Sequence, residues 1–149
     1  MSKENPRQAL NFSNRKRIFE DVRRVVVKLG TRVVTVHDNE LNVKLIQRLA
    51  QEVAQLHNYG VQVAIVSSGA VGAGMGRLGL RERPHRIPEL MATAAVGQGL
   101  LMNAYKLAFC QHNLATGQVL LTAEDLDDRM RYVNARNTLE SLFDFGAVP

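Results

Sequence analysis

Two short segments combine the residue types that bind phosphates and carboxylates. In residues 28–31, Lys28 supplies a cation, and the N–H groups of Gly30 and Thr31 can donate hydrogen bonds to phosphate oxygens. Residues 67–70 read Ser-Ser-Gly-Ala, and hydroxyl and N–H groups at a helix start suit a carboxylate or a phosphoryl oxygen. Each segment also has an ordinary structural explanation, as a strand-end lysine that reaches solvent or a serine that caps a helix.

The elements around these segments predict that both lie at one edge of a parallel sheet. Residues 25–29 and 61–66 are apolar, β-branched runs, which are typical of strands buried on both faces. Residues 41–57 lie between them and carry apolar side chains at helical spacing. In such a unit the carboxyl ends of parallel strands meet at one rim, where ligands gather. We therefore expect the two segments to form a single anion site.

The rest of the chain continues this alternation and predicts an α/β fold with a mainly parallel sheet. We expect Thr31–Thr35 to be a further extended piece and residues 80–88, with two prolines, to be a loop. Residues 89–112 and 134–145 are predicted helices, and Gln118–Leu121 is a predicted third strand. The acidic cluster at 124–128 lies beside arginines, so we interpret it as a helix start and predict no metal ligands.

Composition and charge narrow the class of protein. No window approaches the ~18 uninterrupted apolar residues of a membrane span. The single cysteine, Cys110, excludes an intrachain disulfide framework and is expected to pack as a small core residue, so we expect a cytoplasmic protein. Residues 1–24 carry a net charge of +4, which leaves +1 for the other 125 residues. Residues 1–23 are thus expected to be a basic, polar leader, and nucleic acid is an unlikely partner.

Several longer stretches resemble one branch of a known family. VVVKLGTRVVT at 25–35 and VAIVSSGAVGAG at 63–74 are similar to the first signature segments of the glutamate 5-kinases, within the amino acid kinase family. AAVGQGLLM at 94–102, GQVLLT at 117–122 and RYVNARNTLESL at 131–142 follow in the same order. The resemblance covers residues 24–149 and implies a three-layer α/β/α sandwich with a mainly parallel sheet.

The resemblance also implies an activity. Glutamate 5-kinases transfer the γ-phosphoryl group of ATP to the side-chain carboxylate of L-glutamate, the first step of proline biosynthesis. Lys28 is then the catalytic residue that neutralises charge on the phosphoryl group, and proline is a possible feedback inhibitor. The implied roles are ATP phosphate binding by Lys28, Gly30 and Thr31, glutamate binding by Ser68, Gly69 and Ala70, and a possible substrate or feedback region at Gln118 and Asn134.

The same resemblance implies that part of the kinase lies outside this sequence. The nucleotide pocket and the residues associated with Mg²⁺ are expected beyond Pro149, so residues 24–149 are expected to be the amino-terminal half of a truncated kinase domain. We expect the chain alone to be inactive, and the full-length protein to be a homo-oligomer. Two alternatives stay open: another member of the amino acid kinase family, and a non-catalytic glutamate- or proline-binding protein.

Overall fold

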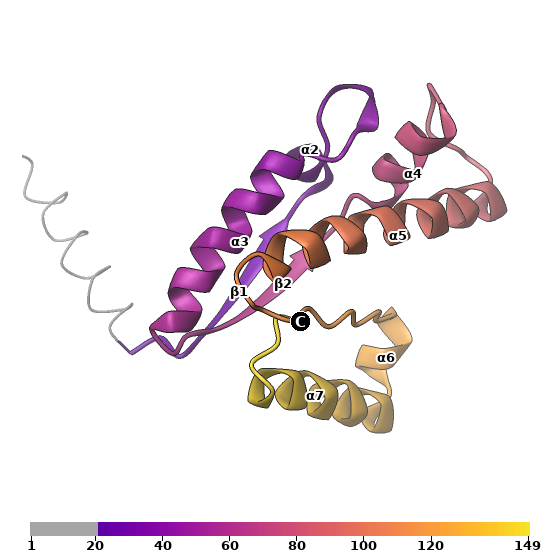
Figure 1. Cartoon of the computed structure of the whole chain (residues 1–149). Coiled ribbons are helices and arrows are strands. Elements are labelled where there is room, and N and C mark those ends of the chain that lie inside the picture. The colour runs from indigo at the N-terminus through magenta and orange to yellow at the C-terminus, as the bar shows by residue number, and fades with distance from the viewer. Residues whose placement is uncertain (1–20) are drawn as a thin grey trace, which may run out of the picture.

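A parallel pair of strands forms the centre of the molecule (Figure 1). The computed structural model describes residues 21–149, apart from the side chain of Asp38, so most of the predicted leader lies outside the described residues. Strands β1 (Arg24–Leu29) and β2 (Gln62–Ser67) pair in parallel, with Lys28 opposite Val66 and Leu29 opposite Ser67. The α/β class, the parallel sheet and both predicted strands are confirmed.

Two helices cover one face of this sheet. Helix α3 (Val43–Asn58) begins at Asn42, whose side chain accepts a hydrogen bond from the N–H of Leu45, and it confirms the helix predicted between the strands. Helix α5 (Ile87–Cys110) lies beside α3, and it begins two residues earlier than predicted, so the loop expected at 80–88 ends at residue 86. One core joins buried residues of both helices with Val63 of β2, and alternate strand residues pack against it partly buried: Val25, Val27, Leu29 and Ile65. Its buried members are Val34, Ile46, Ala50, Val53, Val63, Leu101, Tyr105, Ala108, Phe109 and Val148.

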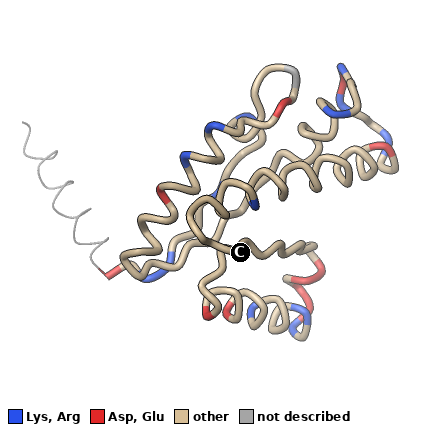
Figure 2. Tube along the Cα trace, in the orientation of Figure 1, with Lys and Arg blue, Asp and Glu red and all other residues tan. Residues whose placement is uncertain are grey.

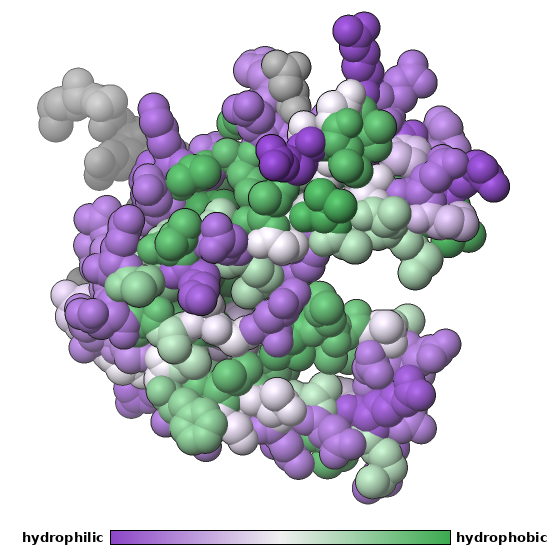
Figure 3. Space-filling view, turned by 45° about the vertical axis from the view of Figure 1, so that its right-hand side comes forward, coloured by the Kyte–Doolittle hydropathy of each residue, from purple (hydrophilic) through white to green (hydrophobic). Residues whose placement is uncertain are grey.

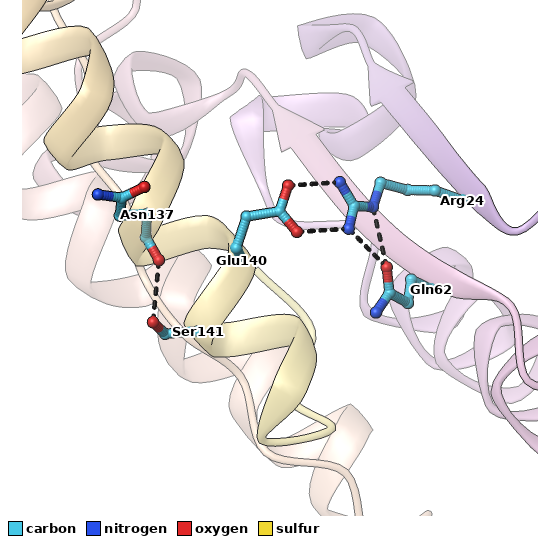
Figure 4. Close-up of polar contacts among 5 residues, drawn as sticks. All are labelled: Arg24, Gln62, Asn137, Glu140 and Ser141. Atoms are coloured by element: carbon cyan, nitrogen blue, oxygen red, sulfur yellow. Dashed lines mark hydrogen bonds and ion pairs between the residues drawn. The ribbon is translucent and has the colours of Figure 1, made fainter.

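Helix α7 (Arg129–Asp144) is tied to the start of β1 by a charged contact (Figure 4). The Arg24 guanidinium donates to both carboxylate oxygens of Glu140 at 2.9 and 2.7 Å and also to the side chain of Gln62. The same guanidinium lies 4.3 Å from the ring centroid of Phe143. Since Arg24 is half exposed, this contact fixes where α7 sits more than it stabilises the fold.

Helix α7 follows a short helix, α6 (Ala123–Asp127). Glu124 and Asp125 of the acidic cluster lie in the first turn of α6, which confirms its interpretation as a helix start. Thr122 caps it, with reciprocal hydrogen bonds between Thr122 and Asp125. Figure 2 colours several positions around α6 as acidic, and mostly basic positions with one acidic one in the loop between α4 (Ala70–Leu78) and α5. No helix within residues 21–149 is long and apolar enough to cross a membrane.

The prediction of a third strand at Gln118–Leu121 is wrong. Residues 118–121 have no ladder partner, and the only pairing nearby is a parallel bridge between Thr116 and Val148. The carbonyl of Pro149 accepts a hydrogen bond of 2.9 Å from the N–H of Ile65, so residues 148–149 lie between β2 and residue 116. Residues 118–121 therefore pair with no strand in the described part of the chain.

Three further expectations differ from the structure. Residues Thr31–Val34 form a short helix, α2, instead of an extended piece, because the N–H groups of Val33 and Val34 both bind the carbonyl of Gly30. The strands are not buried on both faces: Val26 is 63% exposed and Val66 is 52% exposed. Cys110 is exposed near the end of α5 instead of packing in the core. A 3-10 turn, η1 (His37–Asn39), connects α2 to α3.

Helix α5 crosses helix α4 (Ala70–Leu78) at very short range. A Cβ atom at Gly97 would overlap the carbonyl oxygen of Ala70, and one at Gly74 would overlap the carbonyl oxygen of Thr93. Glycine at these two positions therefore lets the two helix backbones touch. The crossing determines where the first turn of α4 lies.

Replacing Gly97 should test this crossing. Gly97→Ala forces the two helices apart and should lower the free energy of unfolding by about 1–3 kcal/mol, the usual cost of overpacking. Gly99→Ala is the matched control on the same helix, because nothing lies within 4 Å of its Cβ position. Gly99→Ala should stabilise by up to ~1 kcal/mol through helix propensity. Urea unfolding of both variants measures the difference, and equal stabilities would contradict the crossing.

The Arg24–Glu140 pair predicts how stability depends on acid. The hydrogen bond from Arg24 lowers the pKa of Glu140, so the contact contributes above the unfolded carboxyl pKa of about 4.3 and is lost as the pH falls through the folded value. Glu140→Gln should therefore flatten the fall in melting temperature between about pH 5 and pH 3. Glu52→Gln, which breaks a pair within α3, should keep the wild-type slope. Identical slopes for wild type and Glu140→Gln would refute the role of the pair.

Candidate functional site

The turns that follow β1 and β2 meet at one rim of the sheet, as the sequence predicted. The carbonyl oxygen of Leu29 accepts two hydrogen bonds from Ser68, one from its N–H and one from its hydroxyl, both at 3.0 Å. The Thr31 hydroxyl in turn donates to the Ser68 hydroxyl at 3.3 Å. Two anion-suited segments that are far apart in sequence are thus joined by direct contacts.

Helix α4 starts at this rim and presents unpaired N–H groups to it. Its cap is Gly69, whose φ of 114° is a conformation that L side chains rarely adopt. The first intrahelical bond runs from the N–H of Ala73 to the carbonyl of Gly69. The N–H groups of Ala70, Val71 and Gly72 therefore have no acceptor within the helix. Together with the helix dipole, they suit a carboxylate or a phosphate group.

The Lys28–Thr31 side of the rim is open. Lys28 is exposed, it lies opposite Val66 in the ladder, and none of the ion pairs found in residues 21–149 involves it. A Cβ atom at Gly30 would have nothing within 4 Å. The described chain leaves room at this glycine for an anion to approach the backbone, with the Lys28 cation available nearby in sequence.

The Ser68 hydroxyl is already engaged by the protein. It donates to Leu29 and accepts from Thr31, so its single proton is in use. A ligand carboxylate can bind the free N–H groups of α4 without breaking these bonds. Ser68 therefore holds the turn in place in this structure, and the backbone of Gly69 and Ala70 is the better placed donor to a ligand.

Sequence reasoning missed one residue, Tyr105, that supports the turn through Ser67. Tyr105 of α5 is only 5% exposed, and its hydroxyl donates to the Ser67 hydroxyl at 2.9 Å. The Ser67 hydroxyl donates to the Ser68 carbonyl at 3.1 Å. Burial raises the pKa of Tyr105, so its hydroxyl remains a proton donor. Tyr105 lies within the helix predicted at residues 89–112, but nothing in the sequence indicated its contact with Ser67.

The structure places Gln118 and Asn134 in different cavities. Gln118 lines a cavity of about 470 Å³ together with Ser67 and Tyr105, so it lies on the same side of the molecule as the rim. Asn134 lines a separate, shallow cavity of about 500 Å³ formed by α7 residues and Phe145. Figure 3 shows a notch with hydrophobic walls between the arm formed by α4 and α5 and the arm formed by α6 and α7.

No cluster of three or more potential metal ligands occurs among the described residues 21–149. Asp125 has an evident structural partner, because hydrogen bonds from the Thr122 backbone and hydroxyl lower the pKa of its carboxyl group. Every buried side-chain nitrogen or oxygen atom in the described part of the chain has a hydrogen-bond partner. The chemistry that this rim offers is anion binding by N–H groups and a lysine.

Comparison with known proteins identifies the family. The model of the amino acid kinase family matches residues 23–149. The chain belongs to the amino acid kinase family. The family assignment made from the signature segments is therefore confirmed, and the rim built by β1 and β2 is part of an amino acid kinase domain.

Curated relatives within this family share a name. The chain is 44% identical to a glutamate 5-kinase of Clostridium acetobutylicum over 138 residues, which cover 93% of this chain and 52% of the relative. It is 52% identical to a glutamate 5-kinase of Moorella thermoacetica over 131 residues, covering 88% of this chain and 35% of the relative. A glutamate 5-kinase of Clostridium tetani is 46% identical over 136 residues, 91% of this chain and 51% of the relative. The chain spans about a third to a half of the length of these relatives.

Replacing Gly69 and Gly30 by alanine should have different effects on stability, because the two turns have different backbone conformations. Gly69→Ala forces an L side chain into a positive-φ conformation and should lower the free energy of unfolding by about 1–2 kcal/mol. Gly30 has a φ of −80° and open space at its Cβ position, so Gly30→Ala should change stability by less than about 0.5 kcal/mol. Chemical unfolding measures both values. A Gly69→Ala variant as stable as Gly30→Ala would show that the turn at 69 is not held as described.

Proposed function

We propose that this chain carries the glutamate-binding rim and the catalytic lysine of a glutamate 5-kinase, which moves the γ-phosphoryl group of ATP to the side-chain carboxylate of L-glutamate. The observation that carries the proposal is the joined rim, in which Ser68 binds the Leu29 carbonyl twice and so places the 28–31 and 67–70 segments together. The names of relatives that are 44–52% identical supply the choice of glutamate as acceptor.

The geometry suggests a division of work among the proposed residues. The N–H groups of Gly69 and Ala70, held by Ser68, bind the glutamate carboxylate at the positive end of α4. Gly30 and Thr31 contact ATP phosphates through the backbone, and the Lys28 ammonium offsets negative charge on the transferred group. The donors at this rim fit a polyphosphate. We further propose that the ligands of Mg²⁺ lie in the part of the relatives' length that this chain does not cover.

The proposal extends to the whole protein. Its fold would be the three-layer α/β/α sandwich, with α3 and α5 on one face of the sheet and α7 at the other. We further propose that it is cytoplasmic, forms a homo-oligomer and is inhibited by proline, with Gln118 and Asn134 in the substrate or feedback region. The placement of these two residues in separate cavities favours separate roles for them.

The role of Lys28 can be measured in an active context. A hybrid enzyme in which this chain replaces the matching part of the Clostridium acetobutylicum relative should release ADP only when L-glutamate is present. Lys28→Ala should lower kcat by about 10²–10³-fold, the usual effect of removing one group that stabilises transition-state charge. Lys44→Ala, an exposed lysine on α3, is the matched control and should change kcat by less than about twofold.

Two results would contradict the proposal. Glutamate-independent ADP release by the hybrid would show that the acceptor is a different molecule. Equal activities of Lys28→Ala and Lys44→Ala would show that Lys28 does not serve the reaction. We expect this chain alone to release no ADP, because it spans only part of the relatives' length.

A further inference from the structure

Helix α5 contacts the turn after β2 at two separate points. Near the middle of the helix, the backbone of Gly97 lies against the carbonyl oxygen of Ala70. About two helical turns later, the Tyr105 hydroxyl donates to Ser67. Ser67 and Ala70 are the two ends of the segment that contains Ser68 and Gly69, so α5 fixes this segment at both ends.

The contact at Tyr105 continues into the turn. The Ser67 hydroxyl accepts from Tyr105 at 2.9 Å and donates to the Ser68 carbonyl at 3.1 Å. On the other side of the turn, the Ser68 hydroxyl donates to Leu29. The carbonyl of the Ser68–Gly69 peptide group is therefore linked to α5 through Ser67 and Tyr105. The side chain of Ser68 is linked to β1 through its hydroxyl, which donates to Leu29. The N–H of that same peptide group belongs to Gly69, which begins the proposed carboxylate site.

The hydroxyl of Tyr105 is not needed for packing. The ring lies in the core with Leu101, Ala108 and Phe109, and a phenylalanine ring would fill almost the same volume. A buried hydroxyl costs free energy unless it has a hydrogen-bond partner, and its partner here is a residue of the turn. This arrangement points to a role for the hydroxyl at the rim.

We propose that Tyr105, acting through Ser67, is a positioning residue that orients the Ser68–Gly69 peptide group for the acceptor carboxylate. The inference rests on the proposed glutamate site but names two residues outside it. Removing either hydroxyl frees the Ser68 carbonyl to rotate, which turns the Gly69 N–H away from the ligand. Binding of the amino acid weakens, whereas binding of ATP at Gly30 and Thr31 does not change.

Three substitutions test this role in the chain itself. Tyr105→Phe and Ser67→Ala each remove one hydroxyl of the relay, and Tyr59→Phe removes a hydroxyl from a tyrosine that is 82% exposed. Amide hydrogen exchange by NMR should be about fivefold faster at Ser68, whose N–H donates to Leu29, in the first two variants, because the turn is held less firmly, and unchanged in α3. The double variant should be no faster than either single one, because both act through one relay.

Titration of the hybrid enzyme, carrying wild-type or substituted residues, with L-glutamate and, separately, with ATP gives the second readout. Tyr105→Phe should raise the Kd for glutamate about fivefold and leave the Kd for ATP unchanged, which general destabilisation would not do. Unchanged exchange at Ser68, or additive effects in the double variant, would overturn the relay. If the hybrid enzyme with no further substitution binds no glutamate, the proposed acceptor site fails, and the exchange data still decide whether Tyr105 positions the turn.

Discussion

The rest of the site depends on the carbonyl oxygen of Leu29, the last residue of β1. It accepts hydrogen bonds from both the N–H and the hydroxyl of Ser68. The parallel pairing therefore continues for one residue beyond Ser67, the last residue of β2. A slip of one residue in the register of a strand would move Lys28 to the other face of the sheet and leave Ser68 without this acceptor. The ladder register therefore determines which side chains and N–H groups meet at the rim.

Helix α5 is the second element that supports the rim. It approaches α4 closely because glycine residues at the crossing have no side chains to separate the two backbones. Gly97 and Gly74 let the backbones of α5 and α4 touch, which places the start of α4 directly over the end of β2. Glycine inside a helix costs up to ~1 kcal/mol relative to alanine, so the local preference of α5 is weakened in exchange for a close crossing. The dense glycines at 69–76 thus serve two purposes: a left-handed cap at Gly69 and close packing along α4.

The strands, the long helices and the shared rim could be predicted from the sequence because their signals are local. Apolar runs at 25–29 and 61–66 and the helical spacing at 41–57 each specify one element. Residues 118–121 look equally strand-like, but a strand needs a partner, and pairing depends on residues far away in the chain. The contact between Tyr105 and Ser67 was missed for the same reason, since it depends on groups brought together by folding.

The way the rim is held also explains why so few charged side chains are needed there. The hydroxyls of Thr31, Ser67 and Ser68 are all used within the protein, so they keep the backbone N–H groups of α4 at fixed positions before any anion arrives. Fixed dipoles stabilise developing charge without the reorganisation that mobile side chains or water require. In the proposed reaction, the exposed Lys28 supplies the mobile charge near the group that is transferred.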